Sequence, residues 1–414
     1  MLSFWLTRGV DGFRVDAVPF LYESTDISRD EPPAVDWTAF GAHQLTQNVP
    51  PIHSLCATLM ATVRSHGADN FFLGEVCAHS YSRTHATHPL SPTHAHTLFI
   101  LQHTSTHMHA TGDCAVPLAK DDAVLIDRWW QVYAPLADII AYYGSPSEPQ
   151  FSMPFNFGLL MDAADYVPSR IASAIEMYQA AVPSWGWSNY VLSNHDNPRI
   201  ATKVGRSRAA LANLMLLTLR GTPTIYYGQE LGMTDVQIPL NATRDPWARQ
   251  MGLSYGRDPE RTPMQWTCEA NAGFCPAVNC TPWLPVAPNF CTAGVNVQAE
   301  LTEAGSTLRV LMATIAARRR SHALLDGSQR LLLSNNATGL LAFTREAIGS
   351  PTAVVVLNWG TEATTADLAQ GFAGSGYATL STIDGEYAPR RVVQMAAVSI
   401  APGEGLLLFS ELVD

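Results

Sequence analysis

The first run of apolar residues, at positions 10–18, is interrupted by charged residues in a way that suits a strand end near a functional site. Its apolar and glycine positions, closed by Pro19, predict a β-strand. Arg14 and Asp16 lie two positions apart, so on a strand they project from the same face. A guanidinium beside a carboxyl group favours the ionised form, which a carboxylate nucleophile needs. A structural ion pair fits the same spacing, and this segment alone leaves both interpretations open.

Two later apolar runs also end in acidic residues. Residues 71–76 (FFLGEV) and 190–196 (YVLSNHD) are short strand-like runs that carry Glu75 and Asp196 at their ends. Apolar residues at helical spacing over 52–66 precede the first of these runs, which is the order of a βαβ unit. Strands that each end in a carboxylate indicate acids gathered at the carboxyl rim of a parallel barrel.

The remaining pattern separates a mixed α/β region from an all-β region. Further helices are expected at 124–143, 168–182, 208–220 and 301–322, and further strands at 153–160 and 222–227. From about residue 324 only short strands follow, at 330–333, 340–344, 353–357, 378–382, 392–395 and 405–409. We therefore expect a barrel domain over 1–323 and a small antiparallel β-sandwich over 324–414.

Composition and charge narrow the function classes. The formal net charge of −11 argues against nucleic acid and anionic membranes as partners. No apolar run approaches the ~18 residues that span a bilayer, so no membrane segment is expected in this chain. Three N-x-S/T sequons, at Asn241, Asn279 and Asn336, favour a secreted or luminal protein.

Two segments have an unusual composition. Four of the seven cysteines lie in a loop at 268–291. Because no CxxC pair is present, we favour a loop closed by disulfides over a zinc site. The sequence leaves open which cysteines pair with one another. Residues 79–114 are rich in histidine but irregularly spaced. We interpret this tract as a low-complexity insertion and not as a metal site, and a metal-buffering function is accordingly disfavoured.

Five segments together carry a family resemblance. GFRVDAV, GEV and SNHDNPR, followed by GTPTIYYGQE (221–230) and GRDPERTPMQW (256–266), resemble signature segments of the α-amylase family of glycoside hydrolases. The last segment is similar to the branch that contains maltases, oligo-1,6-glucosidases and amino-acid transporter heavy chains. The resemblance implies an α/β fold, the (β/α)8 TIM barrel. In that family the GFRVDAV strand is the fourth of eight, so the chain is expected to be the C-terminal part (strands 4 to 8), with any signal or anchor in a preceding part.

The resemblance also assigns roles to particular residues. It implies that Asp16 is the nucleophile and that Arg14 keeps it ionised. Glu75 would be the general acid/base, with a raised pKa, and Asp196 would clamp the sugar. These roles are those of a retaining glycosidase.

Further roles concern the substrate. His195 is expected to contact sugar hydroxyls, and Arg199 to orient His195 and Asp196. Ala17, next to the nucleophile, favours α-1,4 linkages. No cofactor is implied and no metal site is assigned.

Two functions follow from this resemblance. The first is an α-glucosidase that cuts maltose and short maltooligosaccharides, with little or no activity from residues 1–414 alone because the barrel would not close. The alternative is the non-catalytic ectodomain of a transporter heavy chain, which would have a transporter light chain as its partner. The presence of all three acids favours the enzyme.

Overall fold

A computed structural model describes residues 1–26, 28, 45–76, 136–161, 166–275 and 279–412. The chain forms two compact units, one of Met1–Val18, Pro51–Val76 and Pro135–Asp414, the other of Pro19–Pro50 and Cys77–Ala134. In the second unit the amide of Asn48 donates to the carbonyl of Pro19 at 2.9 Å. The histidine-rich tract at 79–114 and the first part of the helix expected at 124–143 lie outside the described residues.

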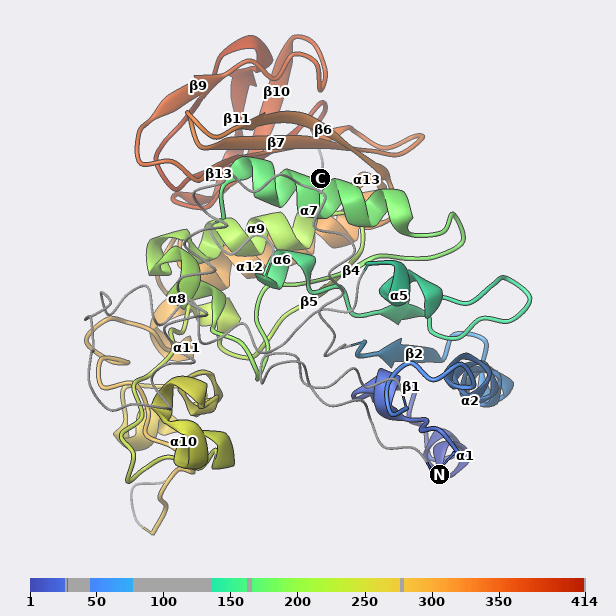
Figure 1. The fold of residues 1–414 in the computed structure, drawn as a ribbon. Helices are drawn as coiled ribbons and strands as arrows, with labels where there is room; N and C mark the ends of the chain where they lie inside the picture. The colour runs from blue at the N-terminus through green and yellow to red at the C-terminus, as the bar shows by residue number, and fades with distance from the viewer. Residues whose placement is uncertain (27, 29–44, 77–135, 162–165, 276–278, 413–414) are drawn as a thin grey trace, which may run out of the picture. The chain divides into compact units, whose positions relative to one another are not determined.

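Parallel strands build the first part of the larger unit (Figure 1). β1 (Gly12–Val15), β2 (Phe71–Gly74) and β3 (Met153–Pro154) form a three-stranded sheet, and β4 (Asn189–Val191) pairs with β5 (Thr222–Thr224). α2 (Ile52–His66) connects β1 to β2, as its apolar spacing predicted. Among the described residues no backbone ladder joins β3 to β4, so the strands are seen as two parallel groups.

Several element boundaries differ from the prediction because local capping intervenes. The strand expected at 153–160 stops at Pro154, and α6 (Gly158–Met161) follows, with the Asn156 side chain accepting a hydrogen bond from the Gly158 amide at 2.9 Å. The helix expected at 301–322 begins only at Thr307, because Ser306 Oγ caps its first turn. The sequence also missed the short helices α1 (Leu2–Leu6), α10 (Pro246–Met251), α11 (Val297–Glu300) and α13 (His322–Leu325).

The C-terminal region is an antiparallel domain of two unequal sheets. The larger sheet has the strand order β11-β10-β13-β8-β7-β6, and β12 pairs with β9 in the smaller one. The strands are β6 (Ser328–Asn335), β7 (Leu340–Glu346), β8 (Ala353–Asn358), β9 (Thr364–Ala366), β10 (Ser375–Ser381), β11 (Gly385–Gln394), β12 (Val398–Ile400) and β13 (Gly405–Phe409). The predicted antiparallel architecture is confirmed, and the sequence missed only the two three-residue strands of the smaller sheet.

The central strands of the larger sheet are buried on both faces. Along β7, Leu341 and Phe343 pack against helices of the barrel region, while Leu340 and Ala342 face the core shared with the smaller sheet. This alternation follows from the two-residue period of a strand. It explains why β8 and β13 read as continuous apolar runs and not as the alternating pattern of a half-exposed antiparallel strand.

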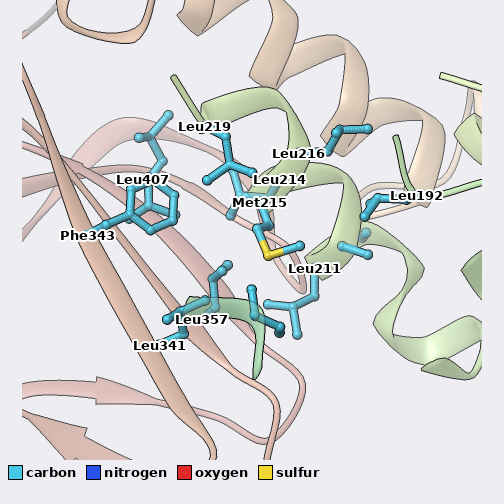
Figure 2. Packing of buried hydrophobic residues seen from close by; sticks show 14 of the residues in the cluster. Leu192, Leu211, Leu214, Met215, Leu216, Leu219, Leu341, Phe343, Leu357 and Leu407 are labelled. Carbon is cyan, nitrogen blue, oxygen red and sulfur yellow. The ribbon is translucent and has the colours of Figure 1, made fainter. Parts of the chain in front are cut away.

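α9 (Ala209–Thr218) is the helix that the larger sheet covers. All ten of its residues are buried. Figure 2 shows Leu211, Leu214 and Met215 of this helix directed toward Leu357 and Leu407 of the sheet. α12 (Thr307–Arg320) packs beside it, and α7 (Pro168–Ala181) packs against β6 and β7 of the sheet. One apolar core therefore runs from the barrel helices into the C-terminal sheet.

A buried acid links α11 to the start of α12. Glu300 is 1% exposed, and its Oε2 atom accepts a hydrogen bond from the amide of Leu308 at 3.0 Å. The nearest cation, Arg206, lies 3.7 Å from the other carboxyl oxygen. Burial raises the pKa of Glu300 to about 7. This carboxyl group therefore holds its proton to a higher pH in the folded chain than in the unfolded chain.

We expect the free energy of unfolding to fall as the pH rises from about 4.5 to about 7, the window between the ordinary pKa of Glu300 and its raised value. In that window the unfolded chain has already released the proton that the folded chain keeps, so deprotonation favours unfolding, by at most about 3 kcal/mol. Glu300→Gln keeps the acceptor oxygen and should flatten this dependence in urea unfolding at pH 5 and pH 8. Glu148→Gln, at an exposed glutamate that does not contribute to the pKa of Glu300, is the control and should leave the slope nearly as it is.

Candidate active site

The carboxyl ends of β1 and β2 bring two acidic side chains together. The strands are parallel, with Val15 opposite Gly74, so the residues that follow them, Asp16 and Glu75, are neighbours. Arg14 donates one hydrogen bond to Asp16 Oδ1 at 2.7 Å and another to Glu75 Oε2. A single guanidinium therefore bridges the two carboxyl groups.

The two carboxyl groups have different environments. A hydrogen bond with the Glu75 side chain lowers the pKa of Asp16; partial burial opposes this shift, and the positive charge of Arg14 reinforces it. The Asp16 side chain is 73% exposed, whereas Glu75 is 5% exposed. The arrangement therefore favours an ionised Asp16 beside a buried Glu75.

A strained turn follows Asp16. Ala17 has φ 45°, in the left-handed region that costs residues other than glycine on the order of 1 kcal/mol. The amide of the next residue, Val18, donates to the carbonyl of Glu75 at 3.0 Å. The chain therefore turns sharply directly after Asp16, and the hydrogen bond to Glu75, the residue after β2, holds the turn in place.

The third acid, Asp196, follows β4 and is held by two arginines of a distant loop. Arg257 and Arg261 donate to its Oδ1 atom at 3.1 Å and 2.6 Å. His195 Nε2 lies 3.3 Å from the other carboxyl oxygen, and Asn194 Oδ1 accepts from the Asp196 amide. Two guanidinium groups on one carboxylate fix its orientation.

A fourth carboxylate anchors one of these arginines. The Asp245 side chain is fully buried, and its Oδ2 atom accepts from Arg257 Nε at 2.9 Å. Burial acts to raise the pKa of Asp245, but the hydrogen bonds from Arg257 and from backbone amides outweigh it and lower the pKa to about 2. Arg257 is therefore fixed from behind while its Nη1 atom reaches Asp196.

His195 interacts electrostatically with both Asp16 and Asp196. Burial lowers the pKa of His195, the charge of Asp196 opposes the shift, and Arg261 and Arg14 contribute to it. The electrostatic influence of His195 also reaches Asp16. Asp16 and Asp196, which follow β1 and β4, are therefore both within electrostatic reach of His195, as expected for the carboxyl rim of a parallel barrel.

Comparison with known proteins assigns this arrangement to a family. The family described as "Alpha amylase, catalytic domain" matches this chain over residues 1–132 and 115–327. The chain belongs to the α-amylase family. The resemblance seen in the sequence segments is thus confirmed, and the family is one of glycoside hydrolases.

Curated relatives within this family include enzymes and a transport protein. The chain is 30% identical to a salivary alpha-glucosidase of Anopheles gambiae, over 99% of this chain and 62% of the relative, and 29% identical to maltase 1 of Drosophila virilis, over 99% and 57%. It is 27% identical to an amino acid transporter heavy chain of Rattus norvegicus, over 99% and 51%. The chain spans about half to three fifths of the length of these relatives.

Solved structures of other proteins show the same fold. An alpha-glucosyl transfer enzyme superposes with a TM-score of 0.71 at 23% identity, over 99% of this chain and 66% of that structure. This likeness supports a TIM-barrel fold followed by a C-terminal antiparallel sheet domain. The helices of the described residues are all too short or too polar to cross a membrane.

Arg199 lies elsewhere than the expected position beside His195 and Asp196. It is 1% exposed, donates to the carbonyl of Tyr227, and lies 5.0 Å and 4.7 Å from the ring centroids of Tyr226 and Tyr227. A side chain so deeply buried supports the end of β5 and does not reach a substrate. Arg257 and Arg261, which the sequence analysis did not single out, make the contacts to Asp196. Their only signal in the sequence was their place in the GRDPERTPMQW segment.

The cysteine loop is stapled by two disulfides, Cys268–Cys291 and Cys275–Cys280. The favoured interpretation is therefore correct, and the pairing that the sequence left open is now defined. None of the four thiols remains as a zinc ligand. Within the described ranges, no group of three or more His, Cys, Asp or Glu side chains could hold a metal ion.

Proposed function

We propose that this chain carries the active site of a retaining α-glucosidase that releases glucose from maltose and short α-1,4-linked maltooligosaccharides. The observation that carries this proposal is the bridge that Arg14 makes between Asp16 and Glu75. Two carboxyl groups on one guanidinium fit the ~5 Å spacing of retaining glycosidases better than the ~6.5–9.5 Å at which inverting glycosidases admit a water molecule. The close pair supports attack by a carboxylate on the sugar itself.

The mechanism assigns one task to each carboxyl group. Asp16 Oδ attacks the anomeric carbon while Glu75 gives its proton to the departing glycosidic oxygen, which leaves a glycosyl ester on Asp16. Glu75, now ionised, takes a proton from water, and the resulting hydroxyl breaks the ester. The sugar leaves with its original configuration, and Glu75 is protonated again.

The remaining site residues position the sugar. Asp196, fixed by Arg257 and Arg261, presents an oriented carboxylate to sugar hydroxyls, and His195 adds a ring nitrogen beside it. Ala17, by its place next to the nucleophile, supports the α-1,4 preference. The names of the insect relatives, alpha-glucosidase and maltase, support the same substrate class.

The direct test is hydrolysis of maltose and isomaltose followed by NMR. We expect faster release of glucose from maltose, and α-glucose before mutarotation, since two inversions retain the configuration. Initial β-glucose would overturn the retaining mechanism. Preference for isomaltose would overturn the linkage assignment.

We expect residues 1–414 by themselves to hydrolyse maltose weakly. In the described sheet β1 pairs only with β2, so it presents an open edge on the side away from β2. The rim next to Asp16 is correspondingly open, and the Asp16 side chain is largely exposed. Turnover by residues 1–414 equal to that of a longer gene product containing them would contradict this expectation.

The alternative proposal is the ectodomain of an amino-acid transporter heavy chain, with a transporter light chain as its partner. Its support is the similarity to the rat transporter heavy chain. The absence of hydrolysis by a folded protein, together with co-purification of a light chain, would favour it. Under both proposals the two disulfides support an oxidising compartment, secreted or luminal.

A further inference from the structure

An exposed tryptophan, Trp283, is hydrogen-bonded to a residue that itself contacts Asp196. Trp283 is 48% exposed, and its indole N–H donates to the carbonyl of Arg261 at 2.8 Å. Arg261 is the residue whose guanidinium binds Asp196. Arg244 Nε in turn donates to the carbonyl of Trp283 at 3.2 Å. The aromatic ring is therefore tied through Arg261 to the acid cluster.

The loop around Trp283 is built to hold the ring in place. The ring of Phe274 packs edge-on against it, with centroids 4.9 Å apart and an interplanar angle of 88°. The next residue, Leu284, is 3% exposed and anchors the backbone. The disulfide Cys268–Cys291 closes the loop on both sides of Trp283. A large apolar side chain that is both fixed and half exposed offers a preformed surface at low entropic cost.

We propose that Trp283 is an aromatic platform on which a second sugar ring of the substrate stacks, beside the ring that Asp16, Glu75 and Asp196 hold. The inference rests on the proposed glycosidase function and extends it to substrate length. A pyranose has an apolar C–H face, and covering it with an indole removes apolar surface of both partners from water. The only polar atom of the indole is already satisfied by Arg261, which leaves the ring face for the ligand.

The kinetic test compares a two-ring substrate with a one-ring substrate on the full chain. For Trp283→Ala we expect the ratio of the KM for maltose to the KM for α-glucosyl fluoride to rise roughly tenfold, the change produced by about 1.4 kcal/mol of lost binding. Trp283→Phe keeps an aromatic face without the indole N–H and should keep this ratio within about threefold of the wild-type value. An unchanged ratio in Trp283→Ala would overturn the proposal.

Trp185→Ala is the matched control. Trp185 is 41% exposed, similar to Trp283, but it lies between α7 and β4 and therefore at the amino end of the strand, opposite the rim that carries the acids. Its substitution should leave both KM values as they are. An equal effect of Trp185→Ala and Trp283→Ala would show a general loss of apolar surface and would overturn the specific role of Trp283.

A binding measurement separates this proposal from the proposed function. Calorimetric titration of maltotriose into the Asp16→Asn chain needs no turnover, and adding Trp283→Ala should weaken binding roughly tenfold while glucose binding changes much less. If the wild type hydrolyses neither maltose nor glucosyl fluoride, the glycosidase function fails, and this titration still decides the role of Trp283. Equal maltotriose affinity with and without Trp283, or no binding at all, would overturn it.

Discussion

Replacing Asp16 with Asn is expected to lower the kcat for maltose by on the order of 10⁴-fold or more. The amide has the shape of the carboxylate but cannot form the glycosyl ester, so the first half of the reaction has no nucleophile. The hydrogen bond with Glu75 and the Arg14 charge, which favour the ionised form of Asp16, would then act on a group that cannot ionise. Initial-rate measurement with maltose, on protein shown to unfold at the wild-type temperature, checks the prediction.

A comparison with Glu75→Gln distinguishes the two roles. Fluoride departs without needing a proton. Glu75→Gln should therefore lower the kcat for α-glucosyl fluoride much less than the kcat for maltose, whereas Asp16→Asn should lower both severely. Asp11→Asn, an exposed carboxylate just before β1, is the matched control and should retain wild-type turnover. More than about one hundredth of the wild-type kcat in Asp16→Asn would show that another group is the nucleophile.

Replacing Arg345 with Met is expected to lower the free energy of unfolding by at least about 3 kcal/mol. Arg345 is completely buried on β7 and donates to three carbonyl oxygens, those of Thr218 at 2.6 Å, Gly327 at 3.0 Å and Ser328 at 3.2 Å. Burial lowers its pKa to about 9. Each buried carbonyl left without a donor costs about 1–3 kcal/mol, and methionine fills the volume but donates nothing.

The location of these carbonyl groups explains why the effect should be global. Thr218 ends α9, whereas Gly327 and Ser328 lead into β6, so Arg345 ties a barrel helix to the C-terminal sheet. Urea unfolding measures the change. Arg345→Lys keeps the positive charge but makes fewer hydrogen bonds, so its free energy of unfolding should fall between those of the wild type and Arg345→Met. Arg330→Met removes a half-exposed arginine of β6 and should change the free energy of unfolding by no more than about 0.5 kcal/mol. Equal stability of Arg345→Met and Arg330→Met would contradict the role of Arg345.

Much of the fold could be predicted because its signals are local. The helix at Ile52–His66 was predicted residue for residue, since its apolar spacing spans the whole element. The strands β9 and β12 were missed because three residues are too few to establish a period. α6 was missed because four residues are too few to establish a helical period.

The candidate site was partly predictable for the same reason. Asp16, Glu75 and Asp196 each follow an apolar strand within a few residues, so a pattern in the sequence places each acid at a strand end. Arg257 and Arg261 could not be assigned to Asp196 in this way, because about sixty residues separate them from it. Arg199, three residues after Asp196 in the sequence, donates instead to the carbonyl of Tyr227.

By itself, the sequence determined the family, the strand-end positions of the three acids, and the order of α/β and antiparallel regions, since each rests on short segments of contiguous residues. Only the tertiary structure decided the bridge by Arg14, the arginine pair on Asp196, the disulfide pairing and the buried contacts of Arg345. These features depend on which strand ends and loops meet in space. A hydrogen bond or a disulfide forms only when two atoms lie close together in space. The number of residues between them along the chain does not determine that distance.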